Sequence, residues 1–202
     1  DPVGAGIVSS MDAATEGVSG VSDAWPYAQQ LELARKHAPG AQRMGVLYNP
    51  GEAASQHGIE QIRALAPGFG FELVEMVATK TTEVLEAAKQ SIDKVDIVYL
   101  SSDNTVIQAL PAALKVCIDN QKPLIVGDSG TVEKGGLAAV SVGYAGVGRE
   151  TGRIVAEFLG GEMVVPPVTA QGDEIYLNAA TAKRIGLELS PELMASATKV
   201  YE

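Results

Sequence analysis

Short apolar runs alternate with helical patterns through the middle of this chain, and this alternation constrains its fold more than any other feature. Buried strands are indicated at residues 44–48, 72–77, 95–100, 124–127 and 137–142, and helices at residues 55–66, 82–92, 104–118 and 146–159. Strands and helices that alternate in this way form a parallel sheet with right-handed crossovers. We therefore expect an α/β fold with a five-stranded, flavodoxin-like parallel sheet, in which the strands 44–48 and 95–100 are adjacent and central.

The chain on either side of this alternation shows other patterns. Residues 3–11 suggest a short helix and residues 17–22 a strand, and Pro26 lies in the first turn of a helix that ends at Pro39. After residue 161 the alternation breaks. There the sequence indicates a strand at residues 173–177, a short helix capped by Asn178 and another helix capped by Ser190.

The charge of the chain argues against two classes of partner. Its 202 residues carry a formal net charge of −10, which repels the phosphate backbone of nucleic acids and anionic membrane surfaces. The 46% hydrophobic content indicates a folded protein, and no apolar run approaches the ~20 residues that span a bilayer. The single cysteine, Cys117, excludes an intrachain disulfide and is expected to be a buried structural thiol. Because the chain starts at Asp1 without a signal peptide, we expect it to be mature, processed or a fragment.

Three polar loops follow predicted strands. In an open parallel sheet, the loops at the carboxyl ends of the strands share one edge, and ligands bind there. The three loops would therefore form one polar cleft. Its candidate ligand-binding residues are Tyr48, Asn49, Gly51, Glu52, Ser55, Ser101, Ser102, Asp103, Asn104, Thr105, Asp128 and Ser129.

Two of these loops also have an ordinary structural explanation. The 49–55 loop ends at a helix N-terminus, where free backbone N–H groups suit a carboxylate or a phosphate, but Pro50 and Gly51 equally make a simple turn. Asp103 could accept hydrogen bonds from a ligand ammonium group or cap the helix that follows it. The sequence alone favours the cap.

No catalytic or metal-binding motif stands out. Residues 143–152 resemble a dinucleotide fingerprint, but the spacing of the glycines is irregular, and close helix packing explains them better. His37 and His57 have no cysteine or carboxylate at ligand spacing and are expected at the surface. Because the sequence shows no Ser-His-Asp set, phosphate-binding loop or carboxylate pair, we expect neither enzymatic activity nor a cofactor or metal site.

Several longer motifs occur in order along the chain and carry a family resemblance. They lie at residues 1–6, 20–23, 39–52, 102–106, 135–139, 148–152, 175–178 and 182–187. In these motifs the chain resembles the substrate-binding proteins of bacterial ABC importers, in the family that includes tryptophan- and tyrosine-type binders. That family has the two-lobed type I periplasmic binding-protein fold.

The resemblance implies that a ligand is held between two lobes. The 49–55 and 101–105 loops, with Asp128 and Ser129, would line one lobe, and Tyr144 and Asp1 would lie near the hinge or the other lobe. Family members have about 300 residues, so about a third of the protein, the start of the first lobe, would be absent here. They often have an asparagine where this chain has Ala54, which removes a polar side chain from the first loop.

The same resemblance divides the chain into four parts. Residues 1–24 would be the remainder of the N-terminal lobe, residues 25–142 the C-terminal ligand-binding lobe, residues 143–163 a segment that returns to the N-terminal lobe, and residues 164–202 the hinge strand and C-terminal helices. In the return segment, Ile154, Val155, Phe158 and Leu159 repeat at helical spacing. Without the first lobe, this stripe would need cover from another chain, from a separate N-terminal segment or from the remaining lobe.

The function implied is capture of a small amino-acid-like solute, aromatic amino acids included, and its delivery to an ABC permease in the membrane. The protein would be periplasmic or extracytoplasmic, with a lipid anchor as an option, and would catalyse no reaction. Two other functions stay open. One is a sensory ligand-binding domain on the same fold. The other is an enzyme on a flavodoxin-like sheet, which a cofactor or a strongly shifted titratable group in the cleft would indicate.

Overall fold

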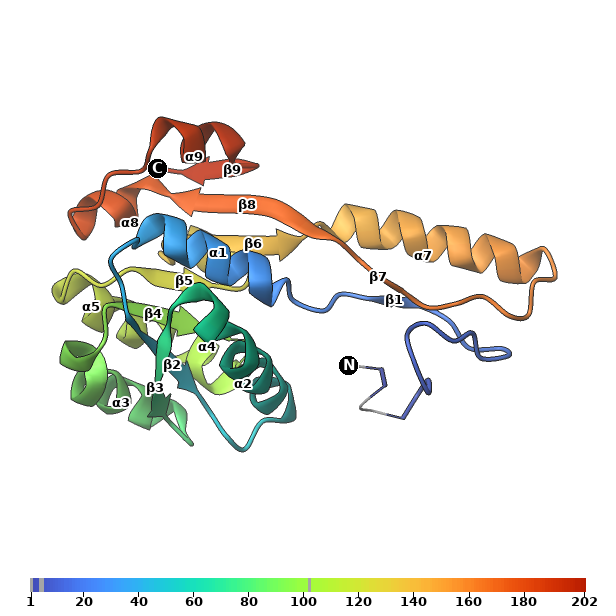
Figure 1. The fold of residues 1–202 in the computed structure, drawn as a ribbon, viewed down its shortest axis with the longest axis horizontal. Coiled ribbons are helices and arrows are strands. Elements are labelled where there is room, and N and C mark those ends of the chain that lie inside the picture. The colour runs from blue at the N-terminus through green and yellow to red at the C-terminus, as the bar shows by residue number, and fades with distance from the viewer. Residues whose placement is uncertain (1, 4–5, 102) are drawn as a thin grey trace. The chain divides into compact units, whose positions relative to one another are not determined.

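A seven-stranded sheet forms the centre of the larger of two units in the computed structural model, which describes residues 2–3, 6–101 and 103–202 (Figure 1). The large unit comprises Tyr27–Ser141 and Ile175–Glu202, and the small unit comprises Asp1–Pro26 and Val142–Glu174. The strands of the sheet, in spatial order, are β3 (Glu72–Val77), β2 (Arg43–Tyr48), β4 (Ile97–Leu100), β5 (Leu124–Val126), β6 (Ala138–Val142), β8 (Gly172–Asn178) and β9 (Lys199–Tyr201).

The predicted parallel core is confirmed. β2 pairs in parallel with β3 and with β4, β4 with β5, and β5 with β6. β2 and β4 are therefore neighbours inside the sheet, as expected, and the order of these five strands is the flavodoxin-like one. The strand near residue 175 is also confirmed as β8, whereas β9, which pairs in parallel with β8, was not expected.

Helices cover both faces of this sheet. Along β4, Ile97 and Tyr99 belong to a core cluster that includes α1 (Tyr27–His37) and α2 (Ala53–Leu65), whereas Val98 and Leu100 belong to a second cluster. The second cluster includes α3 (Val84–Ser91) and α5 (Leu110–Asp119). Successive strand residues point to opposite faces. Because both faces are buried, the central strands β4, β5 and β6 are almost entirely apolar, and the sequence pattern therefore revealed them.

The remaining helices of the large unit are short. They are the 3-10 turns η1 (Ala66–Phe69), η2 (Thr81–Glu83) and η3 (Ile92–Lys94), and the helices α4 (Asn104–Gln108), α6 (Ser129–Glu133), α8 (Ala179–Arg184) and α9 (Pro191–Ser196). The predicted caps are present: Asn178 accepts from the Thr181 N–H, and Ser190 accepts from the Leu193 N–H.

One predicted helix is wrong in its continuity. The helix expected over residues 104–118 breaks at Ala109 into α4 and α5. Pro111 lies at the start of α5, and a proline has no N–H to donate and clashes with the preceding turn. The residues after Asp128, expected as a turn, form the single-turn helix α6.

The small unit is built from two distant segments. Its two strands, β1 (Val21–Ser22) and β7 (Val168–Thr169), pair in parallel, and its helix is α7 (Tyr144–Leu159). The short helix expected at residues 3–11 is wrong for the described part of that segment, which forms turns and bends. Gly6 and Gly17 have positive φ, which interrupts regular structure there and leaves β1 shorter than the expected strand.

The apolar stripe of α7 is partly bare. Ile154 is buried and Phe158 is half-buried, but Leu159 is 84% exposed, and Val155 is also exposed. A side chain added at Gly148 or Gly152 would meet open space, so the close packing expected of these glycines is not found among the described residues. No helix of the described residues is long and apolar enough to cross a membrane.

Cys117 and His37 are both buried in the large unit. Cys117 is buried as expected, and burial raises the pKa of its thiol to about 12. The surface position expected for His37 is wrong. The side chain lies in the last turn of α1, is only 6% exposed, and has no hydrogen-bond partner for Nε2. This burial lowers the pKa of His37 to about 4.

The buried histidine predicts an acid-sensitive fold. The folded state protonates His37 only near pH 4, whereas the unfolded chain does so near pH 6.5, so stability falls as the pH falls between these values. The total loss should be about 3 kcal/mol. Urea denaturation of the wild type and of His37→Phe between pH 4 and 7.5 measures it. We expect the variant to lose this part of the pH dependence and His57→Gln to keep it; parallel curves for all three proteins would refute the assignment.

Candidate functional site

Loops at the carboxyl ends of β2 and β4 are joined through buried Asp103. Asp103 Oδ2 accepts hydrogen bonds from the Asn49 N–H at 2.5 Å and from the Ser55 hydroxyl at 2.7 Å. Its Oδ1 accepts from the Val106 N–H at 2.8 Å, which caps α4. The side chain is 2% exposed. The capping role left open by the sequence is thus observed, together with a tie to the neighbouring loop that no sequence pattern indicated.

Glu52 makes a second tie between the same loops. Its Oε1 accepts from the Thr105 N–H at 2.9 Å and the Thr105 hydroxyl at 2.6 Å. Its Oε2 accepts from the Asn104 N–H and the Asn104 side-chain amide, both at 2.9 Å. The Thr105 hydroxyl makes the largest contribution, and together these donors lower the pKa of Glu52 to about 2 against the opposing effect of burial.

Asn49 completes this network. Its amide nitrogen donates to the Thr105 hydroxyl oxygen at 2.8 Å, and its Oδ1 accepts from the Gly51 N–H at 2.8 Å. The structure therefore brings together seven of the predicted site residues, all in the large unit. They are Asn49, Gly51, Glu52, Ser55, Asp103, Asn104 and Thr105.

Ser101 lies between the end of β4 and this network. The Ser101 side chain is fully buried, and its hydroxyl has no hydrogen-bond partner. It lies against Gly58 of α2, where an added Cβ would overlap the hydroxyl. Ser102 lies outside the described residues.

The third loop, after β5, has a local hydrogen-bond pattern. Asp128 Oδ1 accepts from the Thr131 N–H at 2.9 Å and Oδ2 from the Thr131 hydroxyl at 2.6 Å, which caps α6. Asp128 and Ser129 are both half-buried. Thr131 was missed by the sequence analysis, although an aspartate three residues before it is the usual sign of an N-cap.

Tyr48 and Tyr144 also lie apart from this network. The Tyr48 hydroxyl donates to Glu75 Oε2 at 2.6 Å, and Arg63 pairs with the other oxygen of Glu75. Burial, and then Glu75, raise the pKa of Tyr48. Tyr144 belongs to the small unit, where it begins α7 and is 68% exposed.

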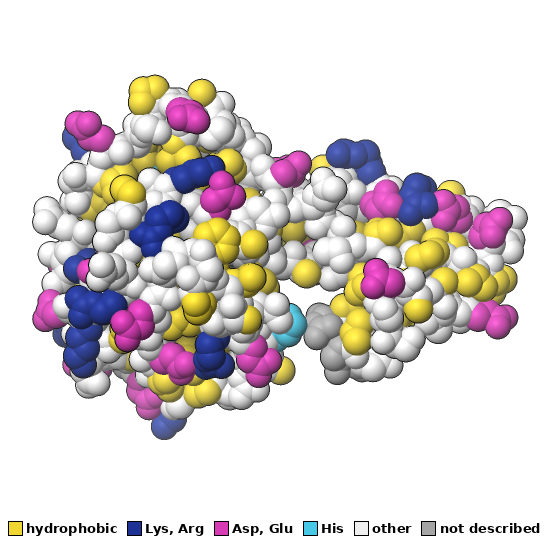
Figure 2. All heavy atoms as spheres, viewed as in Figure 1, with side chains coloured by type: hydrophobic (Ala, Val, Ile, Leu, Met, Phe, Trp, Pro, Cys, Tyr) yellow, Lys and Arg dark blue, Asp and Glu magenta, His cyan; other side chains and the backbone are white. Residues whose placement is uncertain are grey.

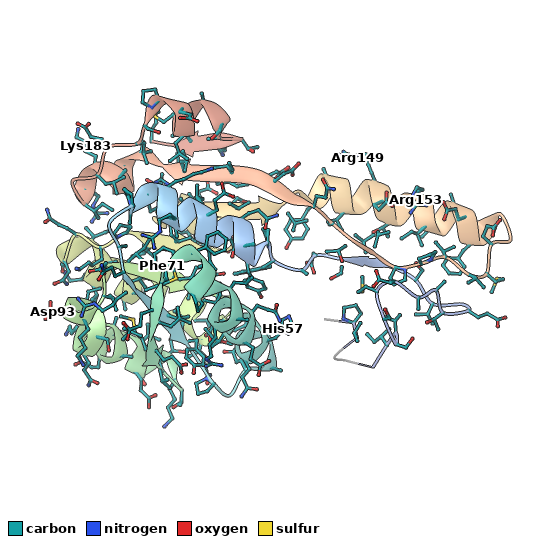
Figure 3. The ribbon with its side chains drawn as sticks, viewed as in Figure 1. His57, Phe71, Asp93, Arg149, Arg153 and Lys183 are labelled. Atoms are coloured by element: carbon teal, nitrogen blue, oxygen red, sulfur yellow. The ribbon has the colours of Figure 1, made fainter. Side chains whose placement is uncertain are left out.

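Among the residues that the structure describes, the acidic side chains of these loops form no ion pair. None of the ion pairs found in the described part of the chain involves Glu52, Asp103 or Asp128. The basic residues labelled in Figure 3 lie on other elements, with Lys183 on α8 and Arg149 and Arg153 on α7. The described residues also contain no cluster of three His, Cys, Asp or Glu side chains that could hold a metal ion. Hydrogen-bond donors alone therefore stabilise these carboxylates.

Known proteins resemble this chain along nearly all of its length. The family model described as "ABC transporter substrate binding protein" matches residues 1–201. The tyrosine-binding protein of Clostridioides difficile is 32% identical over 190 residues, which are 93% of this chain and 55% of that protein. The chain thus spans about half the length of this relative.

Solved structures show the same fold. An ABC domain from Streptococcus pneumonia in complex with L-Trp matches 99% of this chain with a TM-score of 0.85 and 27% identity, over 68% of its own length. A ligand-free, open substrate binding protein from Clostridium difficile matches 95% of this chain with a TM-score of 0.82 and 32% identity, over 65% of its own length. A LacI-family repressor from Corynebacterium glutamicum, 14% identical with a TM-score of 0.54, shares the fold alone.

The contacts of Asp103 predict a large structural role. Asp103→Ala removes the acceptor of two backbone N–H groups and the buried Ser55 hydroxyl, so we expect a loss of about 2–4 kcal/mol in the free energy of unfolding. Asp128→Ala, which removes a local cap at a more exposed position, should cost about 1 kcal/mol. Urea denaturation of both variants tests the difference, and equal, small losses would show that the inter-loop tie contributes nothing.

Proposed function

Because this chain belongs to the ABC transporter substrate-binding protein family, we propose that it captures a small amino-acid-like solute and delivers it to a membrane permease. Substrate binding is the role of the family. The proposal adds the chemical class of the solute, its import, and a position on the outer side of the cytoplasmic membrane. In this role the protein binds and releases its solute and catalyses no reaction.

The acidic loops carry the assignment of the solute. Glu52, Asp103 and Asp128 stand at the ends of neighbouring parallel strands without a cation among the described ion pairs. An edge of this kind has a negative potential, which favours a ligand that carries an ammonium group. An amino acid carries such a group, and one relative is named a tyrosine-binding protein while a structural match holds L-Trp. We therefore propose an aromatic amino acid.

The three loops are the proposed binding surface of the large unit. The three loops contain Asn49, Asp103 and Asp128, respectively. In the sequence, Ser101 and Ser102 precede Asp103, and Ser129 follows Asp128. Tyr144, exposed on the small unit, is proposed as an aromatic contact. Tyr48 supports the loop indirectly, because its hydroxyl is held by Glu75.

Ligand screening of the full-length protein tests this function. L-tyrosine or L-tryptophan, at about 100 times its dissociation constant, should stabilise the protein by about 2.7 kcal/mol. The analogues that lack the ammonium group, 3-(4-hydroxyphenyl)propionate and indole-3-propionate, should bind more weakly. Thermal denaturation with each ligand gives the comparison. Equal stabilisation by the analogues, or none by any amino acid, would contradict the proposal.

The small unit is also proposed to need a partner segment. A two-stranded sheet is marginal in water, and β1 and β7 are such a pair. Gly148, Gly152, Val155 and Leu159 are spaced so that they share one face of α7, which would allow another backbone to approach closely. Figure 2 shows apolar side chains gathered on the small unit, with acidic ones among them. We propose that further polypeptide, from a longer chain or a second protein, adds strands here and covers α7.

This cover makes Leu159 a sensitive position. In the full-length protein, Leu159→Lys should lower the melting temperature, because the side chain would be buried by the added segment, at a cost of about 1–3 kcal/mol. Met194→Lys, at another exposed apolar side chain, is the matched control and should change little. If the two variants melt at the same temperature as the wild type, α7 is a free surface and the proposed cover is wrong.

A further inference from the structure

The structure assigns a positioning role to Glu52. We infer that its carboxylate holds the loop after β2 against the start of α4 before any ligand arrives, and that it does not itself bind the ligand. This inference rests on the proposed function for its ligand, but its structural basis lies entirely within the large unit.

The acceptor sites of Glu52 are fully used. A carboxylate offers about four lone-pair sites, and Glu52 receives four hydrogen bonds, two from Asn104 and two from Thr105. Two of these donors are the first backbone N–H groups of α4, which a helix leaves without an internal partner. Glu52 is therefore a cap supplied to α4 from a different loop. A ligand could use this carboxylate only by displacing a bond that is already made.

Asp103 reciprocates from the other side. It follows β4 in the chain and accepts hydrogen bonds from Asn49 and Ser55, which follow β2. Glu52 follows β2 and accepts from residues that follow β4. Each of the two carboxylates thus accepts hydrogen bonds from donors of the other loop. The Asn49–Thr105 hydrogen bond joins the same two loops. Each loop is fixed by donors of the other, so neither can move alone without leaving charged acceptors unpaired.

Asp128 differs from Glu52 because its carboxylate retains free hydrogen-bond acceptor sites. Each of its oxygens accepts one hydrogen bond, both from Thr131, and the side chain is half-buried. It can accept further donors without losing a bond that joins two loops. The geometry therefore separates two roles among similar residues: Glu52 positions the loops, and Asp128 keeps free acceptor sites for a ligand ammonium group.

Amide hydrogen exchange of the ligand-free, full-length protein tests the positioning role. Glu52→Gln removes the negative charge and replaces one acceptor oxygen by a donor, which would face the donors of either Asn104 or Thr105. We expect the amides of Asn104 and Thr105 to exchange at least about tenfold faster, with a smaller increase over residues 49–55. The matched control is Glu83→Gln. Glu83, at the end of η2, accepts from the N–H and hydroxyl of nearby Thr79, so its loss should act first on the Thr79 amide. The Thr79 region reaches the network only through the 3.4 Å hydrogen bond from the Asn49 side chain to the Thr79 carbonyl, so exchange at Asn104 and Thr105 should change little.

Two results of this experiment would overturn the inference. Unchanged exchange at Asn104 and Thr105 would show that Glu52 does not hold them. A uniform increase over the whole large unit would show that Glu52 contributes to global stability instead of to loop position.

Ligand discrimination supplies an independent readout. Glu52→Gln should weaken L-tyrosine and its deaminated analogue alike, about tenfold, because a displaced loop affects both, and the loss of one charge at the edge should lower the ratio of the two affinities only slightly. Asp128→Asn should weaken L-tyrosine and leave the analogue unchanged. Isothermal titration of the full-length variants measures the ratio. A ratio that collapses in Glu52→Gln would make Glu52 a ligand-binding residue and refute the inference. If the wild type binds no amino acid, the proposed function fails, while the exchange experiment still decides the role of Glu52.

Discussion

Burial of the parallel sheet on both of its faces is the constraint on which the rest of this structure depends. Alternate residues of β4 enter two separate hydrophobic cores, so none of its side chains is exposed to a ligand. Polar groups must therefore gather where the strands end. The network of Glu52, Asp103 and Asn49 stands at this position, directly above the apolar strands that place it.

The network shows how hydrogen bonds from neutral donors can hold negative charge at such an edge. Backbone N–H groups at the start of α4, together with two hydroxyls and two side-chain amides, stabilise the carboxylates and the loops around them. These donors are fixed by the fold and need no reorganisation when a ligand enters. The edge keeps its negative potential, since neutral donors compensate the local cost of burial without cancelling the charge. Under the proposed function, this negative edge would receive the ammonium group of the ligand.

The parallel core and most of the polar loops could be predicted because they depend on local signals. Apolar runs and the polar residues after them are visible in sequence, and so were the caps at Asn178 and Ser190. The partners of those polar residues could not be predicted. Glu52 accepts a hydrogen bond from Thr105, and Tyr48 donates one to Glu75. These partners are far apart in the sequence, and the spacing of residue types along the chain does not indicate such pairs. His37 was placed wrongly for a similar reason, since its burial comes from tertiary packing and not from the pattern of α1.

The pairing of Val21 with Val168 has a consequence for the order in which the chain folds. Closing a loop that contains the whole parallel core is entropically expensive, and two strands of two residues each return few hydrogen bonds for it. The core, by contrast, grows from neighbouring strand–helix units of short separation. We expect the core to form first and to bring the distant ends of β1 and β7 together afterwards. The small unit would then be the last part to fold and the first to unfold, because its two strands lie at opposite ends of the segment that forms the core.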